Sequence, residues 1–259
     1  MRCCVKAIEL IRAKVERGND HIRDLEAAVT EFVKGYKVTP KPDPNLGLVY
    51  TLTSGDDPPP RLSAIAGDAI SNLRGALDHL AYQLVLKGSG ATPSTSTCFP
   101  IAQNASDYKT KAARTLRGAP PGAFSAIDAL KPYKGGNDAL WRLHELSNID
   151  KHRMIVTVGS YFGGFNSKGA GLLRMRPGTP FRALKVGDGL FAPPSDTSRH
   201  RCLMKRLVAL LTPSVKFYFN FGVVLDEPGV IAEPQPVVKT LKQMSRLVDG
   251  IVSDLARFL

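Results

Sequence analysis

The feature that most constrains the fold is the stretch of residues 60–87, which is predicted to form one long amphipathic helix. Pro58-Pro59-Pro60 leads into it, and proline suits the opening turn of a helix. Gly88-Ser89-Gly90 ends it, as glycine commonly does. The apolar residues fall within one arc at about 100° per residue, and they are Leu62, Ile65, Ala66, Ala69, Ile70, Leu73, Ala76, Leu77, Leu80 and Leu84.

Helical periodicity also appears before and after that stretch. Residues 5–34 are predicted to form a long amphipathic helix, which Gly18-Asn19 either breaks or caps midway. The other predicted helices cover residues 105–117, 122–130, 137–152 and 235–258.

Extended segments are predicted between and after the helices. Residues 36–53 contain two strand-like runs joined by a Pro/Asp/Asn/Gly turn, which predicts a hairpin. Gly163-Gly164 and Gly169-Ala170-Gly171 are interpreted as hairpin turns. Shorter extended pieces are predicted at residues 98–101, 154–158 and 215–221, and near 170–176 and 181–187.

The order of these elements indicates the fold class. Helices come first, then strands, then a closing helix, which argues for an α+β protein rather than an alternating α/β one. We expect a mainly helical core with a β-hairpin in residues 1–153, and a β-rich basic region with the closing helix in residues 154–259. One continuous domain is the alternative, since 259 residues suffice for either arrangement.

The chain is strongly basic, with a formal net charge of +12 at pH 7. Segment 160–206 concentrates this excess, because it holds nine basic residues against the two acidic residues Asp188 and Asp196. Such a surplus favours a polyanionic partner, of which nucleic acid is the commonest, and a solvated loop surface is the equally weighted alternative. We therefore expect RNA or another polyanion as a partner.

The sequence predicts a protein of a reducing compartment. No apolar run approaches the roughly 20 residues that span a bilayer, and the opening residues lack the apolar stretch of a signal peptide. The four cysteines, Cys3, Cys4, Cys98 and Cys202, show neither CxxC spacing nor a disulfide framework. We expect a cytoplasmic protein that does not bind a membrane.

Polar residues on two of the predicted helices are the candidates for chemistry. Asp68, Asn72 and His79 lie along one flank of the apolar arc of the helix at 60–87, and Arg74 and Asp78 lie along the other. If this helix packs beside the helix at 137–152, imidazoles, amides and carboxylates converge. Such a set suits proton transfer, because histidine exchanges a proton near neutral pH. The second helix contributes a polar stripe bordered by His144, made of Trp141, Glu145, Asn148 and His152.

The alternative is that these side chains only hold the helices together or lie on the surface. Residues 150–153 end a helix, where basic residues favour the C-terminal dipole without any function. Arg74, Lys151 and Arg153 are nonetheless candidates to hold a phosphate, because their charged donors suit it.

Other chemistries lack their sequence motifs. The chain contains no GxxxxGK[ST] phosphate loop, no HExxH and no GxSxG. His144, Glu145 and His152 give a poor ligand count for a metal ion. We therefore expect no cofactor and no metal.

Three segments together resemble a widespread bacterial and phage family of uncharacterised proteins. They are residues 67–81 (GDAISNLRGALDHLA), Phe99-Pro100-Ile101 and residues 143–153 (LHELSNIDKHR). The resemblance covers roughly residues 5–160. It implies no activity, because that family has none assigned.

A second resemblance is functional. Arg74-x4-His79 is similar to the R-x4–6-H pattern of the HEPN superfamily, helical nucleotide-binding domains that include many metal-independent ribonucleases of toxin and antiphage systems. The resemblance implies that Arg74 stabilises the scissile phosphate and that His79 is the general base or acid. It also implies a homodimer, because that superfamily often builds its site across two protomers. Gly75 departs from the pattern, since a polar residue usually follows the arginine.

The leading hypothesis is thus a HEPN-like endoribonuclease that acts on RNA without a metal. Its candidate catalytic residues are Arg74, His79, Asp78 and His152. Its candidate substrate-binding residues are Asn72, Asn148, Lys151 and Arg153. One alternative is a non-catalytic binding or regulatory protein, in which the two polar stripes only set the register of the helices. Another is a nucleic-acid-binding accessory factor, which would bind with an affinity that falls steeply with salt and would not cleave.

Overall fold

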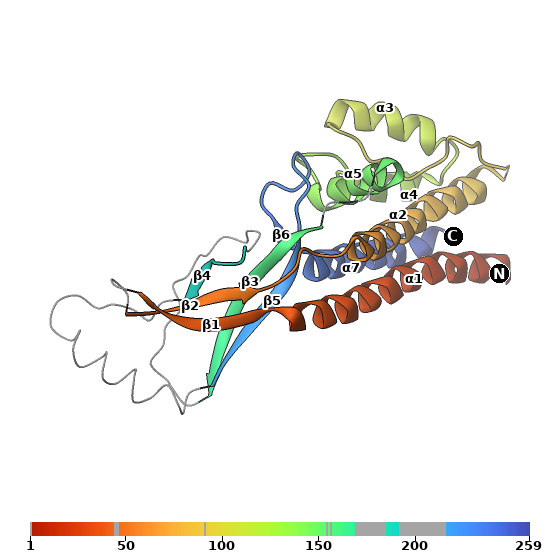
Figure 1. The fold of residues 1–259 in the computed structure, drawn as a ribbon. Coiled ribbons are helices and arrows are strands. Elements are labelled where there is room, and N and C mark those ends of the chain that lie inside the picture. The colour runs from red at the N-terminus through yellow and green to blue at the C-terminus, as the bar shows by residue number, and fades with distance from the viewer. Residues whose placement is uncertain are drawn as a thin grey trace.

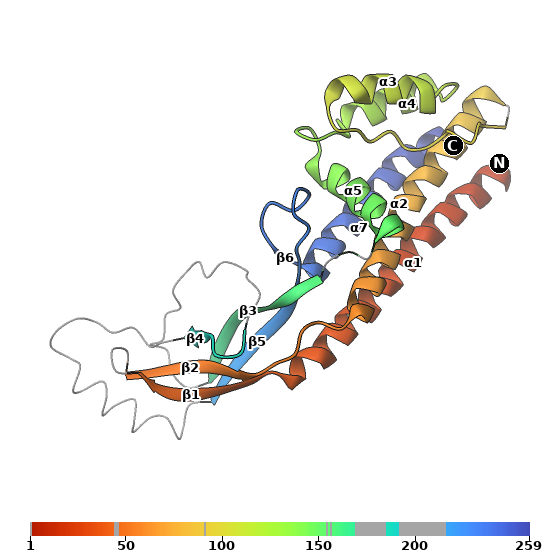
Figure 2. The ribbon, with the colours of Figure 1, turned by 45° about the horizontal axis from the view of Figure 1, so that its top comes forward.

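The computed structural model describes residues 2–43, 47–90, 92–153, 155, 157–168, 185–191 and 216–259, and it confirms an α+β architecture. Long helices lie side by side in one half of the molecule, and the long strands extend from the opposite end (Figure 1). Both chain termini lie at the helical end, as Figure 2 shows from a second direction. In the part of the chain that the structure describes, none of the helices is both long and apolar enough to cross a membrane.

The first 89 residues form a helix–hairpin–helix unit. Helix α1 continues unbroken through Gly18-Asn19, so the predicted break is absent. Gly18 instead lets α1 approach α2 closely, because an added Cβ would lie 3.0 Å from Leu73 Cδ2. The elements are α1 (Arg2–Phe32), the 3₁₀ turn η1 (Val33–Gly35), β1 (Lys37–Asp43), β2 (Gly47–Ser54) and α2 (Pro60–Ser89).

Helix α2 begins and ends where its flanking residues predict. Pro59 is extended, with φ −67° and ψ 147°, and Pro60 occupies the first helical position. Gly90 follows the last turn in the left-handed region, with φ 66°, and its N–H donates to the Leu86 carbonyl. The long apolar helix of residues 60–87 is therefore confirmed.

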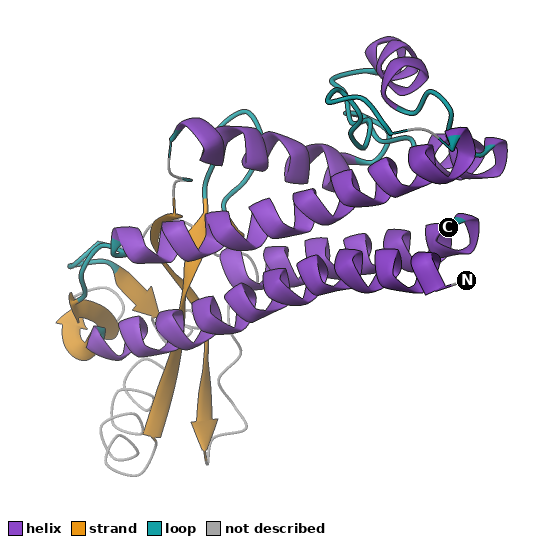
Figure 3. Cartoon of the chain, turned by 90° about the vertical axis from the view of Figure 1, so that its right-hand side faces the viewer, coloured by secondary structure: helices purple, strands orange, loops and turns teal. Residues whose placement is uncertain are grey.

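Three shorter helices follow α2 along the chain. They are α3 (Ala105–Thr115), α4 (Pro121–Ala129) and α5 (Asp138–His152), close to their predicted bounds. Of these, α5 packs against α2. Gly88 of α2 packs closely against the turn before α4, because an added Cβ there would overlap the Gly118 carbonyl oxygen. Seen from the side, α2 lies between α5 on one side and α1 and α7 on the other (Figure 3).

The described strands form two antiparallel sheets of three strands each. One has the order β1-β2-β4, in which the predicted hairpin pairs from Lys37 with Ser54 to Asp43 with Gly47. The other has the order β3-β5-β6. The later strands are β3 (Thr157–Lys168), β4 (Gly189–Phe191), β5 (Lys216–Leu225) and β6 (Gln235–Pro236).

The later strands differ in detail from the prediction. Gly163-Gly164 lies inside β3 rather than in a turn, where the pairing with β5 shifts register between Phe162 and Gly164. A glycine inside a strand commonly accompanies such a bulge, which explains why the turn interpretation is wrong. The segments 170–176 and 169–171 lie outside the described residues, and the described end of 181–187 is a turn before β4.

Helix α7 (Val237–Leu255), followed by the 3₁₀ turn η2 (Ala256–Phe258), completes the helical core. It packs against both α1 and α2, and its buried side chains join the cluster that those helices form. Each buried leucine or isoleucine in this cluster contributes about 1.5–3 kcal/mol of hydrophobic stabilisation. The core draws mainly on Ile11, Ile22, Leu25, Ile70, Leu73, Leu77, Leu80, Leu143, Leu146, Leu241 and Val248, all of which are 2% exposed or less.

Candidate functional site

The polar residues of α2 and α5 meet around Arg74, which is only 5% exposed. Its Nη2 donates to the Phe99 carbonyl at 2.9 Å, and its Nε donates to His144 Nδ1 at 3.3 Å. Its Nη1 lies 2.7 Å from Asp78 Oδ1, an ion pair that lacks hydrogen-bond alignment. Each nitrogen of the guanidinium group therefore faces a partner within the chain.

Asp78 holds the other side of the same peptide segment. Its Oδ1 accepts the Phe99 N–H at 2.9 Å, so an arginine and an aspartate one helical turn apart bind both backbone groups of Phe99. The Phe99 side chain is fully buried, as is that of Ile101. The extended segment 98–101 is thereby fastened to α2 by its backbone and to the core by its side chains.

His144 and Asn148 complete this arrangement on α5. The His144 ring is bound at Nδ1 by Arg74 and contacts the Asn148 amide at 3.3 Å through Nε2. Because arginine is always a donor, Nδ1 must carry the lone pair and Nε2 the proton. The Asn148 atom that faces Nε2 is its amide nitrogen Nδ2, so the amide oxygen would accept from Nε2 only with the amide in the flipped orientation. We call Arg74, Asp78, Phe99, His144 and Asn148 the Arg74 clamp.

The electrostatics of the clamp favour a neutral imidazole. Burial, followed by the positive charges of Arg74, Lys111 and Lys151, lowers the pKa of His144 to about 3. A histidine with that pKa is neutral at physiological pH and cannot deliver a proton as an imidazolium. Its hydrogen bonds suit a positioning role.

Lys111 of α3 makes a further contact with the fastened segment. Its Nζ donates to the Ile101 carbonyl at 2.7 Å, and burial lowers its pKa, opposed by the nearby Cys98 and Asp78. Two cationic side chains, Arg74 and Lys111, and one anionic side chain, Asp78, thus bind backbone groups of Phe99 and Ile101. Lys111 and the role of His144 were not predicted from the sequence. The feature of the sequence that could have indicated this contact is the apolar run Phe99-Pro100-Ile101 between two predicted helices.

A second contact joins α2 to α5 near the end of α5. Ser71 Oγ donates to Asp150 Oδ2 at 3.4 Å, and an added Cβ on Gly67 would overlap that carboxylate. Burial raises the pKa of Asp150, opposed by the Ser71 hydrogen bond. Gly67 is therefore required for the close approach of the two helices here.

The structure separates the other predicted site residues from the clamp. His79 lies on the exposed face of α2, as a rotation of about 140° over five helical residues requires. His152 and Lys151 are exposed at the end of α5. Asn72 donates to the Asp68 carbonyl at 2.8 Å. Of the predicted catalytic residues, only Arg74 and Asp78 lie together.

Arg153 makes a separate ion pair. Its two terminal nitrogens donate to the two carboxylate oxygens of Glu227, at 3.2 and 2.8 Å. Glu227 is fully buried in the segment after β5, whereas the Arg153 side chain is 54% exposed. This contact fastens the end of α5 to the later sheet, so the guanidinium predicted to bind substrate already holds a carboxylate.

The chain was compared with protein-family models, curated proteins and solved structures, and none of them matches. The two resemblances drawn from the motifs therefore stay predictions. In the described ranges, no three His, Cys, Asp or Glu side chains gather in a way that would hold a metal ion.

Proposed function

We propose that this protein binds RNA or another polyanion without cleaving it, and that the Arg74 clamp is part of its folded framework. The inference that the protein does not cleave RNA rests on the position of Arg74, which is 5% exposed and engaged by Phe99, Asp78 and His144. An arginine that stabilises a scissile phosphate must present its donors to the substrate. This guanidinium presents them to its own chain.

The two residues of the R-x4-H pattern, Arg74 and His79, also lie in different surroundings. His79 is exposed, and the clamp's own imidazole, that of His144, stays neutral. A general acid or base works best with a pKa near the operating pH and within hydrogen-bond reach of the reacting group. Neither histidine pairs with Arg74 in a way that meets both conditions.

The binding half rests on charge. The net charge of +12 attracts polyanions, and backbone phosphates supply most of the sequence-independent affinity of nucleic-acid-binding proteins. Exposed Lys151 and His152 are available for such contacts. Of the nine basic residues in segment 160–206, all but Lys168 and Lys185 lie outside the described residues.

Two measurements on the purified full chain test this proposal. The first incubates a mixed RNA panel with the protein in EDTA, and we expect no cleavage by the wild type. The second measures binding of the same RNAs by anisotropy at increasing salt, and we expect affinity to fall steeply with salt. Cleavage that His79→Ala abolishes in a folded protein would refute the proposal and favour the metal-independent ribonuclease.

A further inference from the structure

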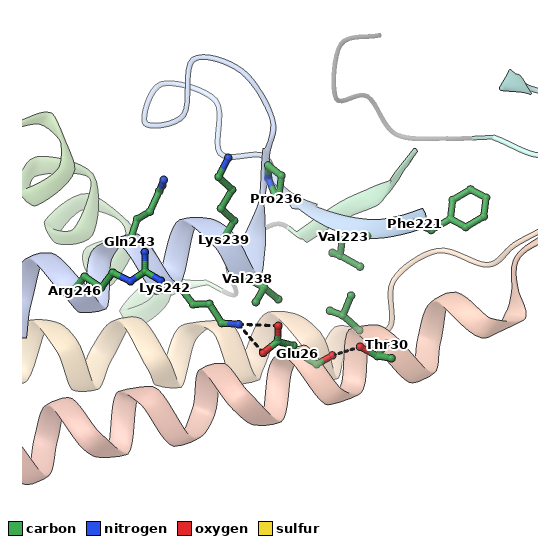
Figure 4. A pocket seen from close by; sticks show the side chains of 12 residues that line it. Glu26, Thr30, Phe221, Val223, Pro236, Val238, Lys239, Lys242, Gln243 and Arg246 are labelled. Atoms are coloured by element: carbon green, nitrogen blue, oxygen red, sulfur yellow. Dashed lines mark hydrogen bonds and ion pairs between the residues drawn. The ribbon is translucent and has the colours of Figure 1, made fainter. Parts of the chain in front are cut away.

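A hollow of about 400 Å³ lies between α1, β5 and the first turns of α7. Val29, Val223 and Val238 form its apolar part, and Val29 and Val223 are themselves buried. Pockets of this size accept one small ligand or one residue of a polymer. We call it the α1–α7 groove (Figure 4).

The groove has a pronounced positive charge. Its lining contains Lys239, Lys242 and Arg246, which recur at helical spacing on α7, against the single carboxylate of Glu26. Lys242 Nζ contacts both Glu26 oxygens at 2.7 Å, as the dashed lines in Figure 4 show. Because Lys242 neutralises Glu26, the remaining charge of the lining is that of Lys239 and Arg246, both of which are exposed.

Polar and aromatic groups border the same hollow. Gln243 lies on α7 between the two exposed cations and offers both an amide donor and an acceptor. Phe221 of β5 lies at the end of the groove, where its ring stacks on Tyr36 with the centroids 5.1 Å apart. The lining of the groove thus combines exposed cations, an amide, an apolar part and, at one end, an aromatic ring.

We infer that the α1–α7 groove binds one nucleotide of a single-stranded RNA. In this arrangement the phosphates contact Lys239 and Arg246, and the base lies against the apolar lining between α7 and α1. A single strand can place an unstacked base against the exposed part of this apolar lining, whereas the bases of a duplex stay stacked in the helix. The inference rests on the proposed function and assigns it a site.

The test measures equilibrium binding of the full chain to three probes. They are a labelled single-stranded RNA of mixed sequence, an RNA hairpin of equal length and inorganic polyphosphate of equal charge. The groove variant is the double substitution Lys239→Ala and Arg246→Ala. The matched control is Lys109→Ala with Arg117→Ala, which also removes one lysine and one arginine, both exposed, in and just after α3. Circular dichroism and the unfolding midpoint establish that all variants fold.

We expect the groove variant to bind the single strand about tenfold more weakly near 0.1 M salt. The slope of log affinity against log salt should also shrink by about 1.4, which corresponds to two lost phosphate contacts on a single strand. The control should change affinity about twofold or less. Wild type should prefer the single strand to both other probes.

The possible failures are distinguishable. If the wild type binds the single strand and both double variants weaken it equally, RNA binding stands and the groove inference is overturned. Equal affinity for polyphosphate and RNA, with the same loss in the groove variant, would also overturn it, since the site would then recognise anions without a base. If the wild type binds none of the probes at low salt, the proposed function itself fails.

Discussion

Arg74→Met is the sharpest perturbation of the clamp, because the two readings of Arg74 predict opposite phenotypes. Methionine keeps an unbranched apolar stem in the buried position but removes the charge and the donors. If Arg74 is a framework residue, the variant loses stability. A catalytic Arg74 would instead leave stability almost unchanged when it is replaced and abolish RNA cleavage.

The size of the loss follows from the contacts. The buried Phe99 carbonyl loses a charged hydrogen bond of 2.9 Å, worth about 1.5–3 kcal/mol. The Asp78 pair adds about 1 kcal/mol or less, because that side chain is 38% exposed. The His144 hydrogen bond adds about 1 kcal/mol. Allowing for non-additivity, we expect the free energy of unfolding to fall by about 3–4 kcal/mol.

Urea denaturation followed by circular dichroism measures this loss, with the midpoint and the slope fitted separately. His79→Ala is the matched control on the same helix, and as an exposed substitution it should stay within about 0.5 kcal/mol of wild type. A loss of less than about 1 kcal/mol in Arg74→Met would refute the claim that the guanidinium holds the 98–101 segment.

Three further predictions use the same unfolding measurement. Gly75→Ala should stabilise the protein by about 0.5–1 kcal/mol, because the space around Gly75 is open. Gly88→Ala should destabilise it, because the added Cβ would overlap a backbone carbonyl. Equal effects of the two substitutions would contradict this prediction. Burial lowers the pKa of His144 to about 3, so the folding stability that the neutral imidazole contributes is fully present above pH 6.5 and is lost as the pH falls towards 3. Wild type should lose about 3 kcal/mol more than His144→Asn between pH 6.5 and 4, and parallel profiles would argue against it. Arg153→Ala removes two hydrogen bonds to buried Glu227 and should cost about 2 kcal/mol, part of which Arg153→Lys restores.

The helices were predictable because their signals are local. The apolar arc of 60–87 and its flanking proline and glycine determine where α2 begins and ends. The long strand β3 was harder to predict, because Gly163-Gly164 is typical of a turn. In the structure these glycines lie in a bulge, where the pairing of β3 with β5 shifts register. The close packing of α1 on α2 at Gly18 is likewise a contact between distant segments, which no local pattern contains.

The candidate site was predictable only in part. Polar residues of the two helices were expected to converge if α2 and α5 packed side by side, and in the structure Arg74 of α2 contacts His144 of α5. The spacing does not reveal what a side chain binds. The role of Phe99 could not be predicted, because it contributes backbone atoms, which every position has. The α1–α7 groove could not be predicted either, because it brings together Glu26 and Lys242, which are 216 positions apart.

That sequence separation has a consequence for the order of folding. The Arg74 clamp closes chain loops of 25 and 70 residues, whereas the contacts of α7 with α1 close loops of 216 and 226 residues. Closing a longer loop costs more chain entropy, and contacts distant in sequence slow folding. Helices α1, α2 and α5 should therefore associate first, and α7 should dock late. A chain in which α7 had not yet docked would leave open to water the apolar faces of α1 and α2 that α7 covers, and exposed apolar surface promotes aggregation.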